Sequence, residues 1–315
     1  MTNPRSIVIS GDIGSGKSTI SLQLASRLGL RRVSVGNLYR DMAQARGMSA
    51  LQLNLHAERD EAVDDQVDQM QAEMARSGEQ LVVDSRLAWH FFPEAFKVHL
   101  IADPGVAARR VMSRPESDVE AYPCMADAVA GLQRRSDSER TRFLLKYGVD
   151  KARLRNYDLV CDTTHVQPGN ITDSIVAAAG GTLSASMHVH PPPLLLLNPR
   201  RVYPGPGVRH LRDLRESGPA EDLQQPGGAD PEPVSAAYTG RYFYLVDGHR
   251  RLSAAVASGR TLLPARLVAE AGEQMAAGLS AQQYFEAMVS LSMICDWAAA
   301  HGIELGVPPH LARGR

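Results

Sequence analysis

A glycine-rich segment near the N-terminus, Gly11-Asp12-Ile13-Gly14-Ser15-Gly16-Lys17-Ser18-Thr19, constrains the fold more than any other stretch of the chain. It follows the apolar run 6–10 and precedes residues 20–28, whose apolar positions 20, 24 and 28 fall on one helical face. A strand, a glycine-rich loop and a helix in this order are typical of a phosphate-binding loop, in which backbone N–H groups surround an anion. A chance glycine-rich turn is the alternative, but the full spacing and both flanks favour a triphosphate site.

The side chains of this loop have distinct expected roles. The Lys17 ammonium can reach the β- and γ-phosphates, and the Ser18 hydroxyl can bind Mg²⁺. We therefore expect ATP and Mg²⁺ as cofactors. The predicted ATP-binding residues are Gly11, Gly14, Ser15, Gly16, Lys17, Ser18 and Thr19.

Composition narrows the function classes. Lys and Arg total 34 against 35 for Asp and Glu, so the net charge favours neither nucleic acid nor a membrane surface as a partner. The three cysteines, Cys124, Cys161 and Cys295, share no metal-ligand spacing and predict no disulfide framework. The apolar runs 7–9 and 191–197 are too short for a signal region or a membrane span. We expect a cytoplasmic protein.

The 315 residues suggest two compact domains. Residues 1–182 alternate short apolar strands with helical stretches, which predicts an α/β domain with a five-stranded parallel sheet. Asp103 before Pro104 predicts a helix N-cap. Acidic residues gather in the predicted helix 51–75, where a solvated face is the simplest interpretation. The predicted strands are residues 6–10, 32–35, 81–84, 98–101 and 159–162; predicted helices include 38–46, 132–146 and 171–179.

The composition changes after a Gly-, Ser-, His- and Pro-containing linker at 183–193. We expect a smaller α+β domain at 194–275 and a C-terminal helical segment at 276–315. The predicted elements are strands at 200–203, 241–246 and 263–268, helices at 252–258 and 281–300, and a long loop at 218–233.

Polar side chains follow two strands of the first domain. Asp84 and Arg86 stand at the end of one strand, and Asn37 and Arg40 follow another. Ligands of open α/β sheets bind at the carboxyl ends of the strands, so these residues are candidates for contact with a second anion. A carboxylate there can hold a Mg²⁺-bound water, and arginines can bind an acceptor phosphate through two N–H groups. Surface salt bridges are the alternative for both arginines.

At these residues the first 180 or so positions resemble the archaeal-type cytidylate kinases of the nucleoside-monophosphate kinase superfamily. The resemblance includes the loop and the segments 33–40, 47–49, 57–60, 82–88, 135–142 and 147–150. It implies a P-loop kinase with a helical lid, acceptor binding by Arg40 and Arg86, a metal-site acid at Asp84, and catalytic lid arginines at Arg135 and Arg142, with Arg110 as a further candidate. An arginine-rich solvated helix is the alternative for the lid.

The chain departs from this family at two positions near the acceptor pocket. Asn37 stands where Asp is common, and Ser85 where Gly is frequent. The base and sugar of the acceptor therefore stay open. The resemblance implies phosphoryl transfer from ATP to a nucleoside monophosphate, with CMP or dCMP as the leading acceptors and Asn37 in the acceptor site. A modified nucleotide or a small-metabolite hydroxyl is the alternative acceptor.

In the second domain the informative stretch is 242–255, where a strand ends at Asp247-Gly248 and a helix opens with His249-Arg250-Arg251. A basic helix start opposes the helix dipole and suggests an anion site. The stretch resembles the ParB/sulfiredoxin-like superfamily, which implies a nucleotide-phosphate pocket at Asp247, Gly248, His249, Arg250 and Arg251. The sulfiredoxin cysteine has no counterpart in this segment, and His249 replaces the acid of many partitioning proteins. A second nucleotide is thus an expected partner, and a nucleotide-sensing regulator that binds CTP or DNA is the third hypothesis, although nothing here indicates a helix-turn-helix.

Overall fold

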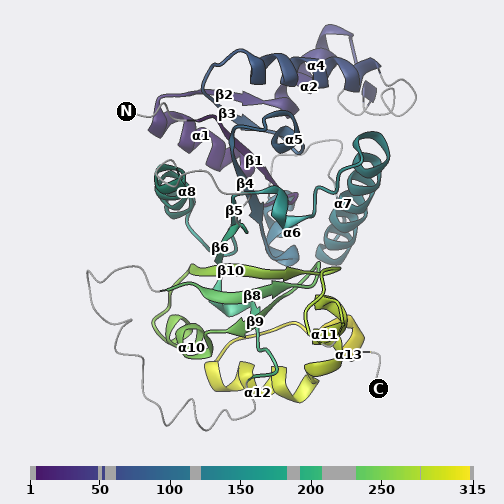
Figure 1. Ribbon diagram of the computed structural model, residues 1–315. Helices are drawn as coiled ribbons and strands as arrows, with labels where there is room; N and C mark the ends of the chain where they lie inside the picture. The colour runs from purple at the N-terminus through teal and green to yellow at the C-terminus, as the bar shows by residue number, and fades with distance from the viewer. Residues whose placement is uncertain are drawn as a thin grey trace. The chain divides into compact units, whose positions relative to one another are not determined.

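The computed structural model describes residues 5–48, 52–53, 62–113, 122–182, 192–207, 232–276 and 278–312. It divides into two compact units, Met1–Val189 and His190–Arg315 (Figure 1). No helix among these residues has both the length and the apolar character needed to cross a bilayer.

The first unit is built on a five-stranded parallel sheet, which confirms the prediction. The order is β2-β3-β1-β4-β5, and every adjacent pair is parallel. Strands β1, β3 and β5 are short and mostly apolar, because a parallel sheet is covered on both faces, whereas the edge strand β2 contains two arginines and a serine. Their bounds are β1 Ile7–Gly11, β2 Arg31–Ser34, β3 Leu81–Asp84, β4 Phe96–Ile101 and β5 Leu159–Asp162.

Helices cover this sheet, and α1 packs on α8 while α6 packs on α7. Asp103 caps α6 as predicted, because its Oδ1 accepts hydrogen bonds from the N–H groups of Gly105 and Val106 at 2.8 and 3.1 Å. The helices are α1 Lys17–Leu28, α2 Val35–Ala45, α4 Ala62–Arg76, α5 Ala88–Phe91, α6 Pro104–Met112, α7 Met125–Tyr147 and α8 Pro168–Thr182, with a 3₁₀ turn η1 at Leu154–Asn156.

Several helices of this unit begin earlier than the sequence predicted, among them α8, which starts at Pro168 rather than at 171. Helix α7 starts at Met125 rather than at 132, because Ala128 and Leu132 pack in one cluster with residues of α6. Helix α2 starts at Val35, directly after β2. Part of the predicted helix 51–75 lies outside the described residues.

The second unit contains a mixed sheet in the order β6-β10-β8-β9-β7. Strand β10 is antiparallel to β6 and parallel to β8, β9 is antiparallel to β8, and β7 is parallel to β9. The elements are β6 Leu194–Leu197, η2 Pro199–Arg201, β7 Val202–Tyr203, β8 Val234–Tyr238, β9 Phe243–Asp247, α10 His249–Ala257, β10 Leu263–Glu270, α11 Ala281–Met288, α12 Leu291–His301 and α13 Pro309–Ala312.

Several predictions for this unit were wrong. The predicted helix 281–300 is two helices, because Val289 is extended and the Ser290 hydroxyl caps α12 by accepting the N–H of Met293 at 3.3 Å. The predicted strand 200–203 keeps only Val202–Tyr203, since Asn198 caps the short η2 turn before it. Strands β6 and β8 were not predicted. Most of the predicted loop 218–233 lies outside the described residues.

Candidate functional site

The glycine-rich loop joins the end of β1 to the start of α1. Gly14 and Gly16 have φ angles of 82° and 94°, which favour glycine. A Cβ on Gly14 would lie 2.6 Å from the Ala107 carbonyl oxygen, so only glycine lets the loop approach α6 this closely. Gly16 is the N-cap of α1 and provides no side-chain cap. The N–H groups of the first turn of α1 are therefore positioned for an anion.

Lys17 folds back over this loop. Its Nζ donates hydrogen bonds of 2.8 and 2.7 Å to the carbonyl oxygens of Gly11 and Asp12. Burial is the main cause that lowers the pKa of Lys17 to about 8; the Arg86 charge acts in the same direction, whereas Asp84 opposes it. The ammonium thus lies beside the loop in a position to receive phosphate.

The rest of the loop is fixed by its own backbone and by its neighbours. Ser15 Oγ donates to the Asp12 carbonyl at 2.8 Å, and Thr163 Oγ1 donates to the Ser15 carbonyl at 2.9 Å. Arg110 donates to the Gly14 carbonyl at 3.3 Å and to the Thr163 carbonyl at 2.7 Å. Arg110 therefore supports the loop from α6.

A cavity of about 490 Å³ opens beside the loop in the first unit. Of the predicted loop residues, Gly14, Gly16, Lys17 and Ser18 line it, while Gly11, Ser15 and Thr19 are not among its lining residues. The other walls come from α2, α4, the end of β3 and α7. These walls include Tyr39, Arg40, Asp64, Asp68, Gln71, Asp84, Ser85, Arg86, Arg135, Arg142, Phe143 and Tyr147.

Ser18 and Asp84 meet at one edge of this cavity. Ser18 Oγ donates a hydrogen bond of 3.2 Å to Asp84 Oδ2. Asp84 is 7% exposed and also binds Arg32, whose Nη2 is 2.8 Å from the same Oδ2. Arg32 Nε donates in turn to Ser21 Oγ at 2.6 Å. The sequence did not mark Arg32 as a site residue.

The Ser18–Asp84 pair fits a magnesium ion. Mg²⁺ is usually bound in nucleotide sites by one or two protein oxygens, with water and phosphate as its other ligands. A hydroxyl and an ionisable carboxyl in contact provide such oxygens. No group of three or more His, Cys, Asp or Glu among the described residues forms a metal cage, and this kind of site needs none.

The predicted acceptor residues divide between the cavity and the surface. Arg40 and Arg86 line the cavity, but Asn37 is not among its lining residues. Instead, the Asn37 side-chain oxygen accepts a hydrogen bond from Arg40 Nη2. Both predicted lid arginines, Arg135 and Arg142, reach the cavity from α7. Arg142 lies 5.5 Å from the Phe143 ring centroid, a cation–π geometry.

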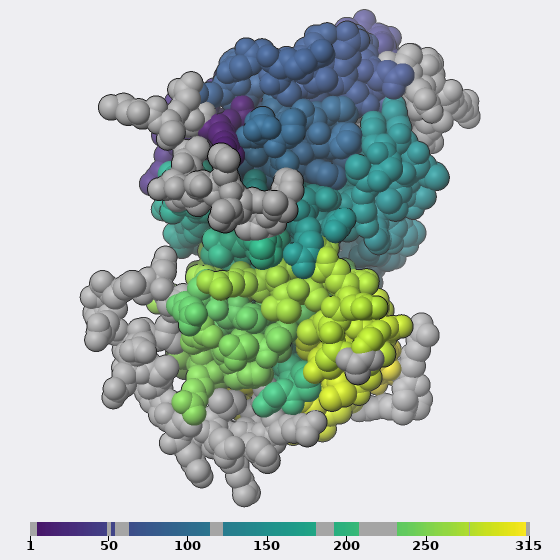
Figure 2. Space-filling view, in the orientation of Figure 1, coloured from purple at the N-terminus to yellow at the C-terminus, as the bar shows by residue number. Residues whose placement is uncertain are grey.

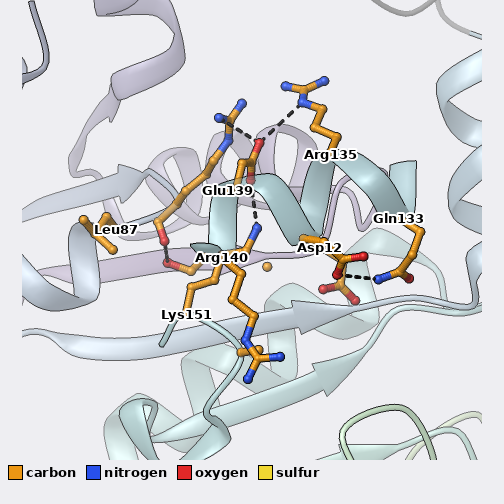
Figure 3. A network of polar contacts seen from close by, with 12 residues as sticks. Asp12, Leu87, Gln133, Arg135, Glu139, Arg140 and Lys151 are labelled. Carbon is orange, nitrogen blue, oxygen red and sulfur yellow. Dashed lines mark hydrogen bonds and ion pairs between the residues drawn. The ribbon is translucent and has the colours of Figure 1, made fainter. Parts of the chain in front are cut away.

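A buried carboxylate, Glu139, joins two of these arginines (Figure 3). It lies 2.9 Å from Arg86 and 3.4 Å from Arg135. Sequence analysis missed it. The signal was present, because Glu139 is an acid within the arginine-rich run 134–142 and stands four residues after Arg135.

The C-terminal end of helix α7 contacts helix α4, which lies above it in the view of Figures 1 and 2. Lys146 Nζ is 2.9 Å from Asp65, and the Tyr147 hydroxyl donates to Asp68 at 2.7 Å. Burial is the main cause that raises the pKa of Asp68. The prediction of a solvated acidic face describes Asp65, which is 65% exposed, but it is wrong for Asp68, which is 20% exposed and lines the cavity beside Asp64.

In the second unit, β9 ends at Asp247 and α10 begins at His249. Gly248 has a φ of 99°, and a Cβ there would lie 2.6 Å from Val234 Cγ1. Arg251 turns back to the segment before β8 and donates to the carbonyls of Glu232 and Pro233 at 2.6 and 3.0 Å. Burial lowers the pKa of His249, although the Asp247 charge opposes it. Of the three basic residues, Arg251 is thus engaged with the backbone, and the lowered pKa of His249 makes it less readily charged than a free histidine.

Comparison with known proteins agrees with this geometry. A family model described as an AAA domain matches residues 7–141. The cytidylate kinase of Natronomonas pharaonis is 36% identical over 174 residues, which cover 55% of this chain and 88% of that protein. The cytidylate kinase of Methanobrevibacter smithii is 33% identical over 54% of this chain and 95% of its own length. That of Ignicoccus hospitalis is 37% identical, also over 54% of this chain and 95% of its own length. The chain therefore belongs, through its first unit, to the cytidylate kinase family, and it is a nucleoside-monophosphate kinase.

Proposed function

We propose that the first unit transfers the γ-phosphoryl group of ATP to CMP or dCMP and produces the corresponding diphosphate. An oxygen of the acceptor phosphate attacks the γ-phosphorus, the bond from that phosphorus to the β–γ bridging oxygen breaks, and ADP leaves with the electron pair. The acceptor oxygen is already anionic near neutral pH. The reaction therefore needs no general base from the protein.

The residues of the cavity provide positioning and charge for this step. The loop residues 11–19 bind the phosphates of ATP, with the Lys17 ammonium close to the transferred group. Arg40 and Arg86 bind the acceptor phosphate, and Asn37 orients Arg40 through the hydrogen bond described above. Arg135 and Arg142 neutralise the charge that spreads over the phosphoryl oxygens. When bound at Ser18 and, through water, at Asp84, Mg²⁺ supplies further positive charge next to the phosphates.

The acidic wall of the cavity is the observation that favours cytosine. Asp64, Asp68 and Gln71 line the cavity on α4. An ionised carboxylate only accepts hydrogen bonds, so it matches the exocyclic amino group of cytosine and opposes the carbonyl that uracil has at the same position. The aromatic rings of Tyr39 and Phe143 also line the cavity and offer faces for a base.

An acceptor screen tests this proposal. We expect kcat/KM for CMP and dCMP to exceed that for UMP by roughly 10- to 100-fold, because the uracil carbonyl and a carboxylate are both acceptors and repel each other where the cytosine amino group would donate. Asp68→Asn should reduce this ratio, since an amide can donate to uracil. Asp65→Asn is the matched control, because Asp65 is exposed on the same helix. A preference for UMP, AMP, a modified nucleotide or a small-metabolite hydroxyl such as serine in the coupled assay would reject the cytosine assignment.

For the second unit, the proposal is a ParB/sulfiredoxin-like module that binds a nucleotide phosphate at Asp247, Gly248, His249, Arg250 and Arg251. The left-handed Gly248 before the nine-residue helix α10 supports it, because this geometry presents backbone N–H groups to an anion.

Calorimetric titration of the full chain with CTP tests this module. It should reveal a site that survives Lys17→Met and is weakened by Arg250→Ala. Tight DNA binding with no turnover of any acceptor would favour the regulator hypothesis instead, and an absence of nucleotide binding outside the first unit would reject the module.

A further inference from the structure

The environment of Glu139 indicates a role in the reaction. Its Oε1 is 2.9 Å from Arg86 Nη1 and 3.4 Å from Arg135 Nε, and Lys151 Nζ donates to its Oε2 at 2.8 Å (Figure 3). Only 8% of the Glu139 side chain is exposed. Burial alone would raise the pKa of this carboxyl group, but the charges of Arg86, Lys151 and Arg135 lower it to about 2. Glu139 is therefore ionised at any assay pH.

Glu139 is placed behind the arginines rather than at the substrate. Arg86 and Arg135 line the cavity, whereas Glu139 and Lys151 are not among its lining residues. A group in this place does not touch the nucleotide. It acts through the two guanidinium groups that do.

The Glu139 carboxylate holds the guanidinium groups of Arg86 and Arg135 close to each other. Two guanidinium groups repel each other, and the carboxylate between them offsets that repulsion. Both contacts are ion pairs to one carboxylate oxygen, Oε1, rather than hydrogen bonds, so charge attraction draws both guanidinium groups toward the same point. Arg86 follows β3 while Glu139 and Arg135 belong to α7, so the same carboxylate also joins the lid helix to the sheet edge.

We propose that Glu139 is a positioning residue for phosphoryl transfer: its carboxylate holds Arg86 toward the acceptor phosphate and Arg135 toward the transferred phosphoryl group, and Lys151 holds the carboxylate from the opposite side. This proposal rests on the acceptor role given above to Arg86. A positioning role predicts a specific kinetic signature. The acceptor KM and kcat should change strongly, while the KM for ATP, which depends on the loop, should change little, because the Glu139 charge is the last-ranked of the influences on Lys17.

Glu139→Gln tests the role with almost no change in side-chain volume. We expect kcat/KM for the acceptor to fall about 10- to 100-fold, the size of effect that a misplaced binding group produces, while the KM for ATP stays within about threefold. Glu139→Asp keeps the charge and should recover part of the loss. Asp137→Asn is the matched control, because Asp137 is an exposed acid of α7 whose Oδ1 accepts from Gln133 at 2.9 Å. It should match the native protein.

Lys151→Met gives an independent test if Glu139→Gln does not fold. Lys151 reaches Glu139 but not the cavity, so its loss should raise the acceptor KM about threefold and leave the KM for ATP unchanged. In the double variant the two effects should not add, because both act through one carboxylate.

Two outcomes would overturn the proposal. One is a folded Glu139→Gln protein with the native acceptor KM and kcat. The other is a set of variants whose activity follows thermal stability alone, with both KM values unchanged. The acceptor screen is carried out first on the native chain. The acceptor with the highest kcat/KM in that screen is then used for the Glu139 and Lys151 variants. If the native chain prefers another acceptor, the cytosine assignment fails but the test of Glu139 proceeds with that acceptor.

Discussion

Replacement of Lys17 by methionine is expected to lower kcat/KM for phosphoryl transfer on the order of 10³-fold. The Lys17 ammonium already lies on the loop, held by the carbonyl oxygens of Gly11 and Asp12 at 2.8 and 2.7 Å. A charge placed before the reaction needs no reorganisation when the transition state forms, so its removal raises the barrier directly. Methionine keeps most of the apolar stem and removes only the charge. Steady-state kinetics with ATP and the preferred acceptor give the measurement.

The same lysine sets a pH dependence that the variant should lack. Since burial lowers its pKa to about 8, Lys17 is protonated below that pH and loses its charge as the pH rises through it. The kcat/KM for ATP reports the free enzyme, so it should be constant below about pH 7 and fall above pH 8. Bound phosphate stabilises the protonated form, and kcat should therefore decline only at higher pH.

A control substitution at a second lysine distinguishes the loss of the Lys17 charge from a general effect of the substitution on the folded protein. Lys97 lies in β4 and is not among the cavity-lining residues, so Lys97→Met should keep the native rate and the native pH profile. Undiminished transfer by Lys17→Met with every acceptor of the screen would contradict the role of the loop. So would a native kcat/KM that does not change between pH 7 and 9.5.

The sequence predicted the parts of the first unit that depend on local pattern. The strand–loop–helix order around Lys17 follows from apolar periodicity and glycine spacing, and the cap of α6 follows from Asp103 and Pro104 alone. The parallel sheet follows from the alternation of apolar strands with helices. These features depend on residues close in sequence, where spacing determines the geometry.

Contacts between distant segments were not predictable in the same way. Arg32 and Asp84 are 52 residues apart and meet because β2 pairs with β3 in the register Ser34 to Asp84. The arginine-rich run of α7 looked uniform, yet Arg135 faces the cavity while Arg140 pairs with Asp150 at 2.8 Å. Which side of a helix meets the sheet depends on packing. The single-helix prediction for 281–300 failed for a local reason, because the cap at Ser290 interrupts an otherwise helical pattern.

The pairing of Arg32 with Asp84 leads to the second large prediction. Asp84→Asn should lower kcat on the order of 10²- to 10³-fold, because an amide lacks the charge that holds the Mg²⁺-bound water. It should also lower the free energy of unfolding of the first unit by about 3 kcal/mol, because it leaves the mostly buried Arg32 guanidinium, 16% exposed, without its carboxylate. Kinetics at saturating Mg²⁺ and urea denaturation measure the two effects.

The double variant Asp84→Asn/Arg32→Met separates these two effects. Methionine removes the uncompensated charge, so the free energy of unfolding should recover most of the loss. The rate should not recover, because Asp84 is the carboxylate that lies next to Ser18, the other predicted magnesium ligand, and the double variant does not restore it. If activity returned together with stability, Asp84 would act only as the partner of Arg32. A rate that falls in Asp84→Asn and stays low in the stable double variant would instead assign this carboxylate to the metal and the phosphates, with Arg32 as the residue that holds it in place.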